Sequence, residues 1–164
     1  MYFRNEITIP LSANKGINPH ELERALRHEY VHAVIAELSG HRCPAWLDEG
    51  IAQFIEGHAN PLLGPALRDW ISENHAMPLG WLKDGFTSLN SELVPAAYAQ
   101  SLFAARSLVN TLGFSAVTKY LKLLKAGVPE NRAFKRAFQK SKSDFEDSLT
   151  AQIERWARSS REDP

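Results

Sequence analysis

The sequence predicts a mainly α-helical fold (α+β in a broad classification) with one strand or a small β element at the N-terminus. Helix start and stop signals bracket most of the chain from residue 18 onward, and apolar residues recur between them at helical spacing. Residues 2–11 are rich in strand-forming side chains. A length of 164 residues fits one domain, which we expect over residues 1–158, followed by a frayed tail at 159–164.

The first helix has the clearest predicted boundaries. Asn18 is a suitable N-cap, Pro19 is favoured at the first helical position, and Gly40 supplies a left-handed stop. Residues 33–36 are apolar almost all round the helix. In a chain without a membrane span, this pattern predicts a helix through the middle of the domain.

Glycines and prolines divide the remainder of the chain into further segments. A second helix is expected to close at Gly57, and residues 58–95 are expected to form an irregular connection that contains one helix. Helical patterns resume after Pro95 and continue to residue 158. The predicted helices are 19–39, 45–55, 67–74, 96–112, 114–126, 130–139 and 143–158.

Composition excludes several classes of protein. The 19 basic and 19 acidic residues cancel, so no nucleic-acid partner is expected from the net charge. A single cysteine, Cys43, permits neither an intramolecular disulfide nor a thiolate metal cluster. No segment approaches the ~20 apolar residues of a membrane span, and no signal peptide pattern is present, so the chain as given is expected to be soluble. Its compartment and its oligomeric state are left open.

The first helix carries the HExxH motif His28-Glu29-Tyr30-Val31-His32. Residues four apart share one helical face, so His28 and His32 can reach one tetrahedral ion while Glu29 flanks the same site. Glu49 follows seventeen residues after His32, at the start of the second helix. It would complete a set of two histidines and one glutamate, which favours zinc and leaves a fourth position open.

Together, this motif and Trp46-Leu47-Asp48-Glu49-Gly50-Ile51-Ala52 resemble the gluzincin metallopeptidases, in particular the aminopeptidase N type branch and the smaller peptidase MA-like domains. The resemblance extends over most of the chain, from residue 18 to about 156. It implies a zincin-like core in which an HExxH helix faces a Glu-ligand helix, with a C-terminal helical bundle over them. It matches Glu49 to the third zinc ligand. It also matches Tyr98, in Ala97-Tyr98-Ala99-Gln100-Ser101, to the transition-state tyrosine of the family.

Metal-assisted hydrolysis gives each of these residues a role. One Zn²⁺ per chain, held by His28, His32 and Glu49, would make water nucleophilic at neutral pH. Glu29 would act as the general base and return the proton to the leaving amine. The phenol of Tyr98 would donate a hydrogen bond to the developing oxyanion.

Three further residues near the motif are open to more than one interpretation. Glu56 lies two helical turns beyond Glu49 and is a candidate to hold a ligand histidine through its second ring nitrogen. Asp48 is the competing candidate for that contact. Cys43 lies between the ligands in sequence, and we interpret it as a small buried or loop residue and not as a ligand.

The sequence therefore predicts a zinc-dependent peptidase that acts on peptide or protein substrates. The Gly-x-Met-Glu-Asn motif, which holds the free amine of the substrate in aminopeptidases, has no counterpart in residues 1–18, so an endopeptidase is expected over an aminopeptidase. The alternative is a latent or inactive zinc-binding module of a larger protein, against which the intact Glu29 argues. A third hypothesis is an anion-binding module that uses the basic residues between 119 and 142, whose binding would depend steeply on salt.

Overall fold

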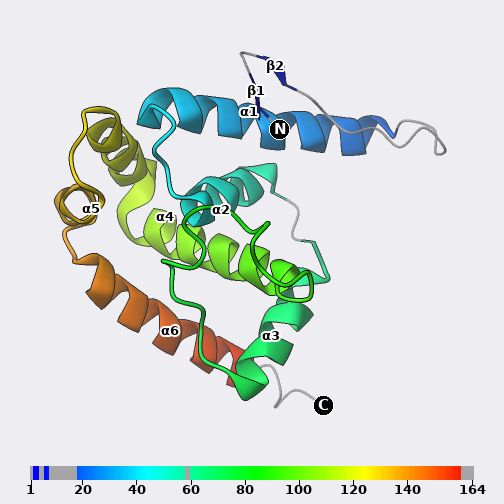
Figure 1. Ribbon diagram of the computed structural model, residues 1–164. Helices are drawn as coiled ribbons and strands as arrows, with labels where there is room; N and C mark the ends of the chain where they lie inside the picture. Colours follow the sequence, from blue (N-terminus) through cyan, green and yellow to red (C-terminus); the bar gives the residue numbers. More distant parts are fainter. Residues whose placement is uncertain (1, 4–5, 8–17, 58–59, 160–164) are drawn as a thin grey trace.

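The computed structural model describes residues 2–3, 6–7, 18–57 and 60–159, and in these ranges it is mainly helical, as predicted (Figure 1). A minimal hairpin precedes six helices in the described part of the chain. The elements are β1 Tyr2–Phe3, β2 Glu6–Ile7, α1 Pro19–Ser39, α2 Ala45–Glu56, α3 Leu63–Glu73, α4 Val94–Lys125, α5 Glu130–Phe138 and α6 Lys142–Ser159. None of the described helices is both long and apolar enough to cross a membrane.

The N-terminal β element consists of two short antiparallel strands that contact α1 (Figure 1). Tyr2 lies opposite Ile7, and Phe3 lies opposite Glu6. The rest of the predicted strand, up to residue 11, lies outside the described residues. The predicted tail also lies outside them from residue 160 onward.

The ends of α1 follow the predicted signals. The side chain of Asn18 accepts a hydrogen bond from the His20 N–H at 3.0 Å, and Gly40 adopts a left-handed conformation with φ 61°. Such a conformation is strained for residues with a Cβ, so the glycine ends the helix at low cost. The end of α2 is built in the same way by Gly57, with φ 79°.

The start of α2 depends on a distant segment. Pro44, at the N-cap, makes no side-chain capping bond. Instead, the Ala45 N–H donates to the Lys83 carbonyl at 2.8 Å, and the Trp46 N–H donates to the Leu82 carbonyl at 2.9 Å. The irregular connection after α3 therefore satisfies donors that a helix N-terminus leaves free.

One helix prediction differs from the structure at its start. α3 begins at Leu63, before the predicted residue 67. The Gly64-Pro65 pair does not prevent this, because a proline in the first turn lacks an N–H that would have no partner there. α4 includes both helices predicted over 96–112 and 114–126, and the predicted break between them is present at Gly113, where the backbone is not helical (φ 74°, ψ 169°).

The prediction that the first helix runs through the middle of the domain is wrong for the described residues. The central element is α4, which packs against α1, α2, α3, α5 and α6 (Figure 1). The apolar residues of α1 are distributed over two faces, and only the face that bears Val31 and Ile35 is covered by α2 and α4. The large apolar side chains exposed on α1 are Leu26, Tyr30 and Val34.

Aromatic side chains fill the core between α4, α5 and α6. Successive ring centroids lie 4.6 to 6.3 Å apart, a spacing that favours edge-to-face and tilted ring contacts. Trp81 does not contribute to this core, because its side chain is 59% exposed. The buried rings of this cluster are Trp46, which comes from α2, and Tyr120, Phe134, Phe138 and Phe145.

The contact between α2 and α4 is close because of one glycine. A Cβ at Gly50 would collide with the carbonyl oxygen of Ser101 and would lie 2.8 Å from the Cβ of Ala105. Only glycine allows the two helix backbones to approach to this extent. This contact sets the position of the preceding residue, Glu49, beside α4.

Candidate metal centre

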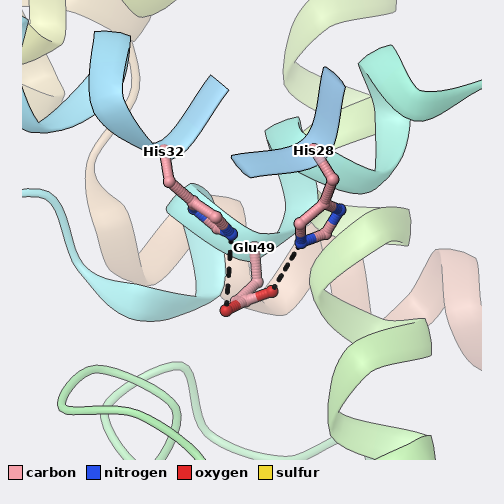
Figure 2. Close-up of side chains that lie close together, drawn as sticks. All are labelled: His28, His32 and Glu49. Carbon is pink, nitrogen blue, oxygen red and sulfur yellow. Dashed lines mark ion pairs between the residues drawn. The ribbon is translucent and has the colours of Figure 1, made fainter. Parts of the chain in front are cut away.

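Three side chains from two adjacent helices converge on one point. His28 and His32 extend from α1 toward Glu49 on α2 (Figure 2). His28 Nε2 lies 3.7 Å from Glu49 Oε2, and His32 Nε2 lies 3.9 Å from Glu49 Oε1. These separations are too long for hydrogen bonds. They are slightly longer than the ~3.3–3.6 Å that separates ligand atoms around a tetrahedral zinc ion with bonds of ~2.0–2.2 Å.

A carboxylate on α2 orients each histidine ring. His28 Nδ1–H donates to Glu56 Oε2 at 3.0 Å, and His32 Nδ1–H donates to Asp48 Oδ1 at 2.8 Å. Because Nδ1 carries the proton in both rings, both Nε2 lone pairs are available on the side that faces Glu49. The two carboxylates that the sequence offers as alternatives thus both make the contact, one with each histidine.

The same carboxylates shift the protonation of the imidazoles. Burial lowers the pKa of His28, but Glu49 and Glu56 outweigh burial and raise it above the ordinary value. Burial also lowers the pKa of His32, where Asp48 and Glu49 together outweigh it. Protons therefore compete with a cation for these two imidazoles more strongly than they would at ordinary histidines.

The three side chains lie in an open cleft of about 850 Å³. Glu29, next to His28, lines this cleft, and so does Tyr98 from the first turns of α4. The Tyr98 ring packs edge-on against Phe86 with centroids 4.7 Å apart. Burial, together with the charges of Glu49 and Glu29, raises the pKa of the Tyr98 hydroxyl, which therefore keeps its proton at neutral pH. All five predicted site residues thus line one cavity.

Sequence reasoning gave no role to Gln53, Arg24 and His41, which line the cleft. Gln53 Nε2 donates to the Glu49 carbonyl and to the Tyr98 carbonyl, both at 3.2 Å, and so connects α2 with α4. The signal that was available is helical spacing: Gln53 follows Glu49 by four residues, and Arg24 precedes His28 by four.

Cys43 lies outside the group of ligand atoms, as interpreted from the sequence. The half-buried thiol points toward the Pro44 carbonyl oxygen, with Sγ 3.6 Å away. Burial and the nearby charges of Asp48 and Glu130 raise its pKa well above the ordinary value, so the thiolate form that a metal requires is disfavoured. Among the other described histidines, His20, His41 and His75 are exposed, and His41 lies at the cleft; His58 lies outside the described residues.

Comparison with protein families gives a match. A model of the peptidase MA superfamily matches residues 5–154, which include both ligand-bearing helices and Tyr98. No curated protein and no solved structure matches the sequence. The family match confirms the resemblance inferred from the two motifs.

Proposed function

This chain belongs to the peptidase MA superfamily, and from that membership we propose that it is a zinc-dependent endopeptidase. Members of the superfamily are typically zinc-dependent. The observation that carries the proposal is the convergence of His28, His32 and Glu49 with both Nδ1 atoms already hydrogen-bonded to carboxylates. A chance cluster of polar residues has no reason to orient both imidazoles toward the same point.

The donor set fits zinc. Two imidazole nitrogens and one carboxylate oxygen, from three residues, leave a fourth position for water or substrate. The expected stoichiometry is one ion per chain. When bound, zinc supplies Lewis acidity, which makes water nucleophilic at neutral pH and polarises the scissile carbonyl group.

Glu29 and Tyr98 provide the proton chemistry in this proposal. The Glu29 carboxylate accepts the proton of the attacking water and delivers it to the leaving amine, a role worth ~10²–10⁴-fold in rate. The Tyr98 hydroxyl donates a hydrogen bond to the developing oxyanion, and its raised pKa favours the protonated form that this role needs. Gln53 keeps the helices that bear Glu49 and Tyr98 in register.

The cleft extends along α1. Arg24 lines it near the N-terminus of α1, and His41 lines it just beyond the C-terminus of that helix. At ~1.5 Å per helical residue, the two positions are roughly 25 Å apart. In this proposal the peptide lies along the cleft in extended form, with residues on both sides of the scissile bond.

The proposal is tested by elemental analysis of the purified protein together with cleavage of casein and of quenched fluorescent peptides, with and without chelator. We expect about one zinc per chain and cleavage that the chelator abolishes. Glu49→Ala should lose both. Glu73→Ala, which removes an exposed glutamate at the end of α3, is the matched control and should keep both.

Two results would contradict the proposal. Stoichiometric zinc without cleavage of any peptide would favour the alternative, a zinc-binding module without activity. A wild-type protein that contains no zinc would contradict the proposed metal site itself.

A further inference from the structure

The carboxylate of Glu56 is shared between two partners from α1. Its Oε2 accepts from His28 Nδ1 at 3.0 Å, and its Oε1 lies 2.9 Å from Arg24 Nε. Arg24 precedes His28 by one helical turn, so both side chains lie on the face of α1 that borders the cleft. An unbroken series of polar contacts therefore leads from a half-exposed guanidinium to a candidate metal ligand.

The second histidine has a different arrangement. Asp48 holds His32 Nδ1 at 2.8 Å, and in the part of the chain that the structure describes no arginine or lysine pairs with this aspartate. Asp48 has a short side chain and lies in the first turn of α2. Fewer side-chain torsions and the positive end of the helix dipole both stabilise a carboxylate in that position.

Glu56 lacks both of these advantages. It is the last residue of α2, where the negative end of the helix dipole disfavours a carboxylate. It also has one more side-chain torsion than aspartate, so holding it in one orientation costs more conformational entropy. The Arg24 guanidinium offsets both costs, because it neutralises the charge and fixes one of the two oxygens.

We propose that Arg24 is a positioning residue of the metal centre: it holds Glu56 in the orientation that accepts the His28 Nδ1–H, and thereby directs His28 Nε2 toward the ion. The inference rests on the metal-binding part of the proposed function and not on hydrolysis. Arg24 itself touches no ligand atom of the candidate metal centre, since its effect passes through Glu56.

A positioning role and a simple charge effect predict opposite changes in zinc affinity when Arg24 is removed. A guanidinium near a dication repels it, so charge alone would make zinc bind more tightly when Arg24 is removed. If Arg24 positions Glu56, its removal weakens binding instead. Loss of a partner that orients a metal ligand costs ~10–100-fold in affinity, and Arg24 acts one contact further out, so we expect a loss of roughly threefold to tenfold.

The experiment measures zinc affinity by competition with a chromophoric chelator, using the intact purified chain at fixed pH and salt. Arg24→Ala should weaken zinc binding by roughly threefold to tenfold, and Arg24→Lys should restore part of the loss because an ammonium group still reaches the carboxylate. Arg27→Ala is the matched control. Arg27 lies on the same helix, is 47% exposed against 48% for Arg24, pairs with Glu23 at 2.8 Å, and does not line the cleft.

A second pair of variants tests whether Arg24 acts through Glu56. In a Glu56→Gln background, Arg24→Ala should have little further effect, because the carboxylate through which Arg24 acts is already gone. Circular dichroism of each metal-free variant should match the wild type, since the Arg24 side chain is 48% exposed.

Each contrary result has a distinct meaning. Unchanged or tighter zinc binding by Arg24→Ala overturns the positioning role while leaving the metal site intact. An equal loss in Arg27→Ala, or an undiminished loss in the Glu56→Gln background, overturns it as well. A wild-type protein that binds no zinc overturns both this inference and the proposed function.

Discussion

The two longest described helices, α1 and α4, have opposite roles in this molecule. In the described part of the chain α1 has 21 residues, of which three are buried, whereas α4 has 32 residues, of which thirteen are buried. α1 supplies His28, Glu29 and His32 to the cleft, while α4 supplies Tyr98 and forms the centre of the core. Of these two helices, the one with fewer buried residues therefore carries most of the candidate chemistry.

This difference has a physical basis. Metal ligands and a general base must face a cavity that substrate can enter, so their helix cannot be covered on all sides. The position of that helix must nevertheless be fixed, and here polar contacts contribute: both ligand histidines are hydrogen-bonded to α2. Burial of apolar side chains around α4 stabilises the fold. Substitutions in α1 and substitutions in α4 should therefore change different measured quantities.

The largest expected effect comes from α1. Glu29→Gln should lower kcat by ~10²–10⁴-fold in the peptide assay, because the amide cannot accept the proton of the attacking water. Zinc content and thermal stability should stay at the wild-type level. Glu21→Gln, an exposed change in the first turn of the same helix, serves as the control. Cleavage at the wild-type rate by Glu29→Gln would contradict the assigned base.

α4 should show a catalytic effect at one position. Tyr98→Phe keeps the ring that packs on Phe86 and removes the hydroxyl, so kcat should fall by ~10²–10³-fold with zinc content unchanged. The comparison with Glu29→Gln is made with the same substrate and at the same pH. A loss of stability comparable to that of a core deletion would show that the hydroxyl is structural.

A matched pair of leucines tests the contrast in burial. Leu121→Ala on α4, where the side chain is 2% exposed, should lower the free energy of unfolding by ~2–5 kcal/mol. Leu26→Ala on α1, where the side chain is 45% exposed, should change it by less than about 0.5 kcal/mol. Urea denaturation of both zinc-loaded variants measures the difference. Equal destabilisation would mean that the outer face of α1 is covered in solution.

Removal of the metal should increase amide hydrogen exchange more in α1 than in α4. At a free zinc concentration of 100 times Kd, binding stabilises the folded state by ~2.7 kcal/mol, and the ligands connect α1 with α2. Chelation should therefore increase amide hydrogen exchange in α1 while the buried part of α4 stays protected. Uniform acceleration along the chain would show that the metal stabilises the fold as one unit.

The sequence by itself determined most helix boundaries and the candidate ligand set. An N-cap at Asn18 and a left-handed glycine at Gly40 act within a few residues, so their effect can be read without knowledge of the fold. The spacing of His28 and His32 fixes their shared helical face for the same reason. Glu49 was identifiable because its motif occurs with the first one in a known family.

Only the tertiary structure decided which apolar face of α1 is covered, and that α4, not α1, is central. It also decided that Glu56 and Asp48 each hold one histidine, and that Gln53 and Arg24 support the cleft. These contacts join residues on different helices. Their formation depends on how closely the helices approach, as at Gly50, and such distances between segments leave no local signal in the sequence.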